Sequence, residues 1–378
     1  MSLELLSNPD LTVGPDQRPR WNSAPHRRHG FHNLHRLLRY SQSFRAGLVM
    51  PLRLSADLTI AARADVRKLT SGPWFSAMIV IEEGRILFES YAPDFGPTQP
   101  HSIMSISKMV LNLMVGRLVE DGTINLAAPV ATYLPMIGAG YAGATVQQVL
   151  DMNLRNAYDE NYQNPLATVF AHEAACGMRL PHGVEVMNRD FVANIGLALG
   201  AADCMNPSGV CDYKSANTEV LAMIVAAVGP RNLQAWLADF ADAAGIEGAL
   251  IVQTDRAGMP ILNGGMCLTA RDLARYGALF ARMGRGVDGT EFGSAAFLRA
   301  TLAGGVPMPA PRSHLRYSNQ TNTNGQWLGH GGYGGQYLLA NPQTGRVAAY
   351  LSVLQNESGY DSAYYPPIIS MLDDICAA

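Results

Sequence analysis

The sequence predicts an α/β fold of the α+β type, in which a mainly antiparallel sheet flanked by helices joins a second, mostly helical lobe. Three observations support this prediction. β-rich runs lie toward both ends of the chain, helical spacing dominates its middle, and turn sequences separate the runs. We expect residues 1–125 and 255–378 to form the α/β lobe, including an N-terminal arm at 1–50, and residues 126–254 to form the helical lobe. A cleft between two lobes is a common place for a site.

The strands of the sheet are predicted in two pairs. Residues 77–81 and 86–88 are β-rich runs on either side of the turn sequence 82–85, which indicates a hairpin. Near the other end, residues 335–340 and 346–353 flank the turn sequence Asn-Pro-Gln-Thr-Gly. Because the two pairs come from opposite ends of the chain, they suggest one sheet built from both.

Helices are predicted from apolar spacing and from capping residues. One should begin near Ser105 and end at Gly122, because apolar residues recur there at helical spacing. Thr269 is a plausible cap for another. The first fifty residues are expected to be an irregular arm that ends in a short helical stretch. The remaining helices are expected at 220–228, 233–244, 271–283 and 368–376.

Composition excludes several classes of function. The 378 residues are 48% hydrophobic and 16% charged, with a net charge of −3, so no overall field favours nucleic acid or an anionic membrane. No apolar run approaches the ~20 residues that a membrane span needs. The first 22 residues lack the apolar stretch of a secretory signal, and we expect a cytoplasmic protein. Its expected partner is a small molecule; the oligomeric state is left open.

Five cysteines occur, and none has metal-like spacing. We expect them to be buried free thiols, because a cytoplasmic protein rarely holds disulfides. A bridge between Cys204 and Cys211 across one loop is the alternative.

The clearest chemical signal is Ser105-Ile106-Ser107-Lys108, an S-x-x-K pattern. Positions i and i+3 lie on one face of a helix, one turn apart, so the hydroxyl and the ammonium converge. A helix N-terminus adds partial positive charge and a free N–H. These effects favour a serine alkoxide and prepare an oxyanion site.

The residues that follow this motif give it context. The stretch 116–126, together with Pro129-Val130 and Tyr133-Leu134-Pro135, resembles the signature region of the superfamily that contains class C β-lactamases, D-peptidases and esterases. The resemblance extends over about residues 75–355. It implies a β-lactamase/transpeptidase-like fold and a serine hydrolase that forms an acyl-enzyme on Ser105, without a metal or an organic cofactor.

The second motif of that superfamily is Y-x-N or Y-x-S, and Tyr213-Lys214-Ser215 fits it, with Asn217 two residues further on. Ser215 and Asn217 are candidate substrate-binding residues. The resemblance makes Tyr213 the general base toward Ser105. A neighbouring Lys108 would favour this role by lowering the pKa of the tyrosine. The alternative is a half-buried loop tyrosine.

The third motif corresponds to His330-Gly331-Gly332. With the residues that follow, it resembles the H-x-G form found in esterases and 6-aminohexanoate-dimer hydrolases of this superfamily. His330 is a candidate substrate-binding residue that could donate one hydrogen bond. Gly332 would let the substrate approach closely, and the N–H of Tyr333 would be the second oxyanion donor. Tyr162 lies where relatives carry a loop over the cleft, and it is a candidate for substrate contact; a surface turn is the alternative.

Two departures from the β-lactamases bear on the substrate. His330 replaces the lysine that would bind a β-lactam carboxylate, and Ser215 stands where class C enzymes carry asparagine. We therefore expect small esters or linear amides to be preferred over β-lactams. The alternatives are a D-aminopeptidase- or β-lactamase-like enzyme for peptidoglycan-type substrates, and a non-catalytic binding protein on the same fold.

Overall fold

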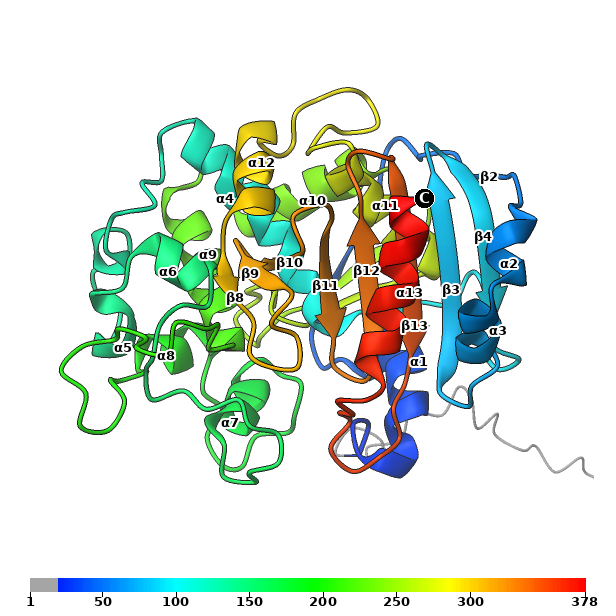
Figure 1. Cartoon of the computed structure of the whole chain (residues 1–378). Coiled ribbons are helices and arrows are strands. Elements are labelled where there is room, and N and C mark those ends of the chain that lie inside the picture. Colours follow the sequence, from blue (N-terminus) through cyan, green and yellow to red (C-terminus); the bar gives the residue numbers. More distant parts are fainter. Residues whose placement is uncertain (1–19) are drawn as a thin grey trace, which may run out of the picture.

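The computed structural model describes residues 20–378, which form two sheets with helices packed around them. Figure 1 shows the large sheet. The large sheet is antiparallel except for its first pair of strands, which is parallel. In spatial order its strands are β2 (Arg53–Leu54), β4 (Arg85–Tyr91), β3 (Phe75–Glu82), β13 (Arg346–Ser352), β12 (Gln336–Ala340), β11 (Leu328–Gly332), β10 (Thr321–Thr323), β9 (Arg316–Ser318) and β8 (Val306–Pro307). This arrangement confirms the predicted fold class.

The small sheet is also antiparallel, and it lies next to the start of the first motif. Its strands, in spatial order, are β1 (Ser41–Phe44), β6 (Leu250–Gln253), β7 (Met266–Leu268) and β5 (His101–Ser102). Strand β5 leads directly into the residues before Ser105, so this sheet fixes where the motif begins.

Both predicted strand pairs are present. Strands β3 and β4 form the hairpin, and β12 and β13 form the second pair. Strand β13 lies between β3 and β12, which makes one sheet from distant parts of the chain, as predicted. Residues 75–81 of β3 are all buried, because helices cover both faces of the sheet. A strand covered on both faces needs a continuous apolar run.

Helices occur before, between and after the two parts of the sheet. They are η1 (Ala24–His26), α1 (Arg27–Leu37), α2 (Leu58–Ala62), α3 (Ala64–Thr70), η2 (Met104–Lys108), α4 (Met109–Glu120), η3 (Val130–Thr132), α5 (Ala139–Ala142), α6 (Val146–Leu150), α7 (Thr168–Ala175), α8 (Asn188–Ala193), α9 (Ser215–Val228), α10 (Leu233–Ala244), α11 (Ala270–Ala281), α12 (Ala295–Ala303) and α13 (Tyr365–Ala377). Helix α11 packs on one face of β12 and β13, and α13 crosses the other face, in front in Figure 1.

Two helix predictions hold at their capping residues. Thr269 accepts a hydrogen bond from the Asp272 N–H and caps α11, as predicted. Gly122 follows α4 with a φ of 72°, the left-handed conformation that glycine favours after a helix. In residues 20–378 no single helix is long and apolar enough to cross a membrane; α9 and α10, which are bent by 102° from one another, meet that length and composition test only as a pair.

The structure corrects the prediction for the N-terminal arm. Its described part, from residue 20, is not irregular: it contains the eleven-residue helix α1 and the strand β1. Residues 1–19 lie outside the described part of the chain. Arg27 and Phe31 are buried, so α1 is held by tertiary packing. The proposed lobe boundaries at 125 and 254 stay a prediction.

Candidate active site

Ser105 lies in the short 3₁₀ helix η2, not in the first turn of an α-helix. The α-helix α4 begins only at Met109, so the predicted helix start is wrong by four residues. In a 3₁₀ helix, side chains at i and i+3 eclipse one another, which aligns Lys108 with Ser105 directly. Met104, just before the serine, has a φ of 47°, a conformation that costs free energy outside glycine.

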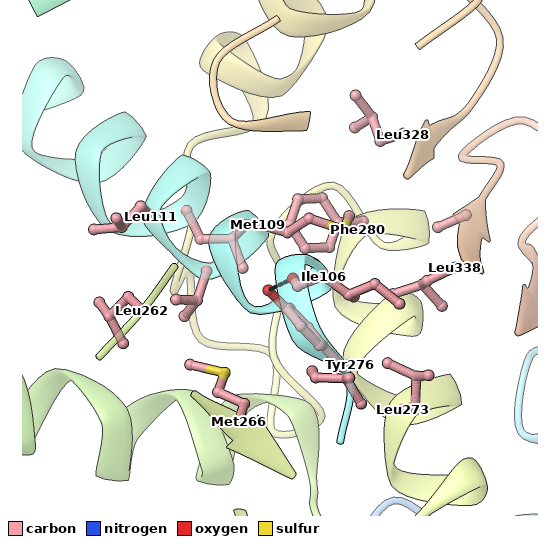
Figure 2. Packing of buried hydrophobic residues seen from close by; sticks show 14 of the residues in the cluster. Ile106, Met109, Leu111, Leu262, Met266, Leu273, Tyr276, Phe280, Leu328 and Leu338 are labelled. Atoms are coloured by element: carbon pink, nitrogen blue, oxygen red, sulfur yellow. Dashed lines mark hydrogen bonds between the residues drawn. The ribbon is translucent and has the colours of Figure 1, made fainter. Parts of the chain in front are cut away.

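Hydrogen bonds and buried side chains hold the turn around Ser105 in place. The Ser107 hydroxyl donates to the Met104 carbonyl at 2.6 Å and accepts from the Met266 N–H at 3.2 Å. Figure 2 shows Ile106 inserted into the core, where its carbonyl accepts a hydrogen bond from the Tyr276 hydroxyl. Ile106 and Ser107, which follow Ser105, are fully buried. The backbone of the turn is therefore held in place, and it fixes the position of the Ser105 side chain at the cleft.

Lys108 is fully buried and directed at Ser105. Its Nζ donates to the Ser105 Oγ at 3.0 Å, to the Ser215 Oγ at 3.1 Å, and to the carbonyl of Asn263. Burial lowers the pKa of Lys108 to about 8, although the charges of Glu160 and Glu219 act in the opposite direction. An amine with this pKa can lose its proton near neutral pH and act as a base.

Tyr213 lies beside this pair, with the Lys108 Nζ 5.1 Å from the centre of its ring. Burial raises the pKa of Tyr213 well above its ordinary value, and the charge of Glu160 raises it further, while the Ser105 hydroxyl opposes the shift. This direction is the reverse of the one predicted from the sequence. The resting Tyr213 is therefore a neutral phenol, a proton donor better than a base.

Glu160 is a site residue that the sequence reasoning missed. Its carboxylate accepts from the Ser215 hydroxyl at 2.8 Å and also from the Ser215 N–H, at the first residue of α9. A carboxylate at a helix N-terminus satisfies a free N–H and is favoured by the helix dipole. Ser215, in turn, links Glu160 to Lys108. Only a three-dimensional contact across 55 residues reveals this chain of groups.

A second acid, Glu219, positions one of the hydrogen-bond acceptors of Lys108. Glu219 is fully buried, and it accepts from the N–H groups of Leu262 and Asn263 at 3.0 and 2.8 Å. This holds the Asn263 carbonyl that accepts from Lys108. Burial raises the pKa of Glu219 to about 7. Neither Glu219 nor Asn263 carried a signal in the sequence beyond its place near a motif.

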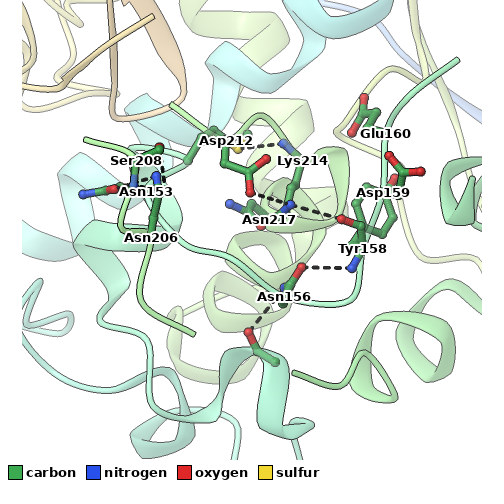
Figure 3. Close-up of polar contacts among 12 residues, drawn as sticks. Asn153, Asn156, Tyr158, Asp159, Glu160, Asn206, Ser208, Asp212, Lys214 and Asn217 are labelled. Atoms are coloured by element: carbon green, nitrogen blue, oxygen red, sulfur yellow. Dashed lines mark hydrogen bonds and ion pairs between the residues drawn. The ribbon is translucent and has the colours of Figure 1, made fainter. Parts of the chain in front are cut away.

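The loop that carries Glu160 is tied to the Tyr213 segment by Lys214 (Figure 3). The Lys214 ammonium donates to the Tyr158 carbonyl at 3.0 Å and pairs with Asp212 at 2.9 Å. Asn156, on the same loop, accepts from the Tyr158 N–H at 3.1 Å. Lys214, the middle residue of the second motif, therefore holds the loop of Glu160 and the segment of Tyr213 in fixed positions relative to one another.

The structure does not bring Asn217 to the site, which corrects its prediction as a substrate-binding residue. It is fully buried, where it accepts from the Tyr141 hydroxyl at 2.9 Å and donates to the Val149 carbonyl at 3.5 Å. The reason is the helical geometry of α9. Two residues correspond to about 200° around the axis, so Asn217 faces away when Ser215 faces Lys108.

The third motif forms the opposite wall. His330 is buried on β11, with Nδ1 2.6 Å from the Gly331 carbonyl and Nε2 3.3 Å from the Tyr317 hydroxyl. Burial, with Lys108 nearby, lowers the pKa of His330 to about 3. The imidazole is therefore neutral, as expected, but protein groups engage both ring nitrogens. It supports β11 and does not present a free donor to a substrate.

Gly332 and Tyr333 end this wall. A Cβ on Gly332 would lie 2.7 Å from the Ile103 carbonyl, so only glycine allows β11 to approach the turn that carries Ser105. The Tyr333 hydroxyl donates to the Ser358 carbonyl at 2.7 Å, and its ring lies 5.0 Å from that of Tyr162. Tyr162 and Tyr333 thus stand together over the site.

Two hollows meet at Ser105. A cleft of about 500 Å³ is lined, among others, by Ser105, Glu160, Tyr162, Tyr213, His330 and Tyr333. A narrower pocket behind it, the back pocket, is lined by residues that include Trp21, Asn22, Met104, His172 and Cys176. The N-terminal arm therefore contributes to the site, which the sequence did not indicate. All five cysteines are free and buried, as predicted.

Comparisons with known proteins agree with this geometry. The sequence profile described as β-lactamase matches residues 76–365. The chain is 30% identical over 302 residues to a 6-aminohexanoate-dimer hydrolase of Paenarthrobacter ureafaciens, covering 79% of this chain and 75% of that protein.

Solved structures share the fold. One described as a 6-aminohexanoate-dimer hydrolase from Bacillus anthracis has a TM-score of 0.81 at 19% identity, over 97% of this chain and 98% of that one. EstCE1, a hydrolase with promiscuous acyltransferase activity, has a TM-score of 0.61 at 15% identity, over 85% and 99% of the two chains. The family profile covers most of the chain, and the three motifs converge on one cleft. The chain belongs to the β-lactamase family and is a serine hydrolase.

Proposed function

We propose that this hydrolase cleaves small esters or linear amides through an acyl-enzyme on Ser105, with Lys108 and Tyr213 moving the protons. The observation that carries the proposal is the 3.0 Å contact between the buried Lys108 Nζ and the Ser105 Oγ at the wall of an open cleft. The name of the Paenarthrobacter relative, 6-aminohexanoate-dimer hydrolase, supports an amide substrate, and the acyltransferase activity of EstCE1 supports an acyl-enzyme.

In acylation, neutral Lys108 accepts the proton of the Ser105 hydroxyl while the Oγ attacks the substrate carbonyl carbon. The N–H groups of Ser105 and Tyr333 receive the oxyanion. Tyr213 donates its phenolic proton to the leaving oxygen or nitrogen, and the bond to the leaving group breaks. The Lys108 ammonium then returns a proton to Tyr213.

In deacylation, water replaces the leaving group and the same groups act in reverse. Tyr213 passes its phenolic proton to neutral Lys108 as it accepts a proton from the attacking water, and the Lys108 ammonium then donates a proton to the Ser105 Oγ as the acid product departs. Glu160 keeps the Ser215 hydroxyl, and through it Lys108, in position during both steps. This scheme departs from the sequence-based one, because Lys108 and not Tyr213 is the first base.

Covalent labelling with a fluorophosphonate tests the proposal, because only an activated serine reacts. We expect one adduct, located by mass spectrometry on the peptide that contains Ser105, and we expect Ser105→Ala to abolish both labelling and the hydrolysis of p-nitrophenyl esters. Ser102→Ala is the matched control: this buried hydroxyl has no hydrogen-bond partner within residues 20–378.

An adduct on Ser107 or Ser215 would contradict the assignment of the nucleophile. An intact fold without any labelling would instead favour the non-catalytic binding protein. A panel that adds aminohexanoate amides and D-amino acid peptides separates linear amides from peptidoglycan-type substrates.

A further inference from the structure

A chain of buried hydrogen bonds connects the back pocket to the carboxylate of Glu219. The Tyr158 hydroxyl, in the wall of that pocket, lies 2.9 Å from the Nδ1 of His172, and the Nε2 of His172 lies 3.0 Å from the Oδ1 of Asn188. The Asn188 Nδ2 then donates to the Glu219 Oε2 at 2.8 Å. All four residues are buried, so their polar groups depend on one another for hydrogen bonds.

The direction of each hydrogen bond in this chain follows from the carboxylate at its end. The Glu219 Oε1 accepts from two backbone N–H groups, and its Oε2 accepts from the Asn188 amide. Because the amide nitrogen faces the carboxylate, the Asn188 oxygen must accept from His172, whose proton therefore lies on Nε2. Burial lowers the pKa of His172 to about 4, so its Nδ1 carries no proton at neutral pH and accepts from Tyr158. Every donor is thus directed toward Glu219, which favours its ionised form.

Asn188 is the main contact that keeps Glu219 ionised. Burial raises the pKa of Glu219 to about 7, and the hydrogen bond from Asn188 is the largest effect in the opposite direction, ahead of the backbone N–H groups. Within residues 20–378, the three hydrogen-bond donors of this carboxylate are all neutral. Removal of the Asn188 amide would therefore leave Glu219 protonated at neutral pH.

The charge of Glu219 acts on Lys108 across the backbone of Asn263. The Asn263 N–H donates to Glu219 at 2.8 Å, and the Asn263 carbonyl accepts from the Lys108 Nζ. The three hydrogen-bond acceptors of Lys108 are uncharged: two serine hydroxyls and this carbonyl. Burial lowers the pKa of Lys108, and the charges of Glu160 and Glu219 oppose that shift. An ionised Glu219 therefore keeps the ammonium stable to a higher pH than a protonated Glu219 would.

The other titratable groups near this carboxylate and ammonium leave the coupling intact. The thiol of Cys176 lies 3.6 Å from the Asn188 Oδ1, and burial raises the pKa of this thiol well above its ordinary value, so it is neutral. Asp255 is engaged by backbone N–H groups, among them that of Asn188 at 3.2 Å. The groups that face Lys108 from the cleft are the neutral Tyr213 and His330 and the carboxylate of Glu160.

We propose that Asn188 and His172 are positioning residues of the hydrolase, which hold Glu219 as an anion and thereby set how readily Lys108 gives up its proton. Each acts on the lysine through Glu219: Asn188 by its hydrogen bond, and His172 by fixing which end of the Asn188 amide faces the carboxylate. This inference rests on the proposed function and deepens it, because it names groups that tune the base of that same site.

The test is the pH dependence of kcat/KM for p-nitrophenyl butyrate. Asn188→Leu removes the amide at similar side-chain size, so Glu219 takes up a proton and no longer opposes the release of the Lys108 proton. We expect the inflection to move to lower pH by about one unit. Glu219→Gln should move it in the same direction and by a similar amount, and the double variant should move it no further than either single variant. A purely structural role would lower kcat/KM at every pH and leave the inflection in place.

A pair of substitutions at His172 tests the orientation of the Asn188 amide. His172→Phe keeps a ring to stack on Phe191, at the present 5.0 Å, but lacks the donor to Asn188, so the amide can turn its oxygen toward Glu219. The inflection should again move to lower pH, but by less, about half a unit, because the Cys176 thiol still faces the Asn188 oxygen. His172→Gln retains an N–H donor near the position of Nε2 and should keep the wild-type inflection.

Asn112→Leu is the matched control for the loss of a buried amide. The Asn112 amide donates to the Thr301 hydroxyl at 3.1 Å and to the Asn319 carbonyl at 2.9 Å, and neither acceptor belongs to the chain that ends at Glu219. This variant should keep the wild-type inflection, whatever its effect on stability. If Asn188→Leu does not fold, the two His172 variants decide, because both fill the space of the imidazole.

The failure of this inference is distinct from the failure of the proposed function. If the folded wild type forms no fluorophosphonate adduct and does not hydrolyse the ester, the hydrolase proposal is wrong and this inference fails with it. If the ester is hydrolysed through Ser105, but folded Asn188→Leu and His172→Phe do not lower the inflection, the positioning role is overturned while the hydrolase stands. An equal shift in Asn112→Leu or in His172→Gln would overturn it as well.

Discussion

At the scale of single residues, Lys108 illustrates how burial and hydrogen bonding set the chemistry. A fully buried ammonium is costly, and here three acceptors offset that cost: the Ser105 and Ser215 hydroxyls and the Asn263 carbonyl. The remaining penalty lowers the pKa of Lys108 to about 8. At pH 7 about a tenth of such amines are neutral, which is enough for a base.

The pH dependence of kcat/KM follows from this pKa. We expect kcat/KM for a neutral ester to rise with pH and to level off above about 8, since only the neutral amine accepts the Ser105 proton. Glu160→Gln removes a negative charge that raises the Lys108 pKa, so the inflection should move to lower pH, by about one unit.

Asp159→Asn is the matched control for this shift, because it neutralises the neighbouring acid, whose carboxylate bonds to Asn164 and not to Ser215. An inflection that is the same in wild type and Glu160→Gln would contradict the coupling of Glu160 to Lys108. A rate that falls as the pH rises through 8 would contradict Lys108 as the base.

The site was predictable where its chemistry is local. Ser105 and Lys108 are three residues apart, so their spacing alone predicts that they converge. Glu160 and Glu219 act through contacts with distant segments, and no pattern along the chain relates them to Lys108. Asn217 shows the converse error: closeness to a motif in sequence does not place a side chain on the same face of a helix.

At the scale of elements, the close approach of β11 to the η2 turn decides whether the two halves of the site meet. Gly332→Ala places a methyl group 2.7 Å from the Ile103 carbonyl, which is backbone and cannot rotate aside. We expect β11 to move away and kcat to fall about tenfold to a hundredfold, because oxyanion donors act only at short range. Steady-state kinetics with a p-nitrophenyl ester measure the effect.

Gly143→Ala is the control, since the space around this exposed glycine is open and its φ of −90° suits alanine. A Gly332→Ala variant with wild-type kcat would show that this approach is not needed for catalysis. An equal loss of kcat in Gly332→Ala and Gly143→Ala would indicate a general loss of stability.

The elements divide into those that local sequence determines and those that packing determines. The β3–β4 hairpin and the capped helix α11 carry their own signals: β-rich runs around a turn, and a capping threonine. Strand β1 has the polar sequence Ser-Gln-Ser-Phe and exists because β6 pairs with it. The sequence also could not predict a 3₁₀ helix in place of an α-helix at Ser105, because both types of helix bring the side chains of residues i and i+3 together.

At the scale of the whole molecule, Arg27 joins the N-terminal arm to the residues after β13. Its buried guanidinium donates to the carbonyls of Leu354 and Asn356 at 2.7 and 2.6 Å, and to the Asn22 side chain at 2.9 Å. The arm that this arginine anchors supplies Trp21 to the back pocket. The arm therefore contributes to both stability and the site.

Arg27→Met should lower the free energy of unfolding by about 2–4 kcal/mol, because it leaves several buried carbonyls without donors. Thermal or urea unfolding followed by circular dichroism measures the loss. Arg299→Met, on the exposed face of α12, should stay within about 0.5 kcal/mol of the wild type. Unfolding of Arg27→Met at the wild-type temperature would show that the arm is not held by this residue.

The position of β13 has a consequence for how the chain is made. During translation the ribosome releases β3 some 260 residues before β13, the strand that separates it from β12. Until residues 346–352 emerge, the nascent polypeptide holds an apolar hairpin with an open edge and no neighbour to pair with. Long-range pairing of this kind is slow and leaves chains prone to association. Synthesis of this hydrolase therefore contains a long interval in which a chaperone that shields the β3 edge would raise the yield of folded protein.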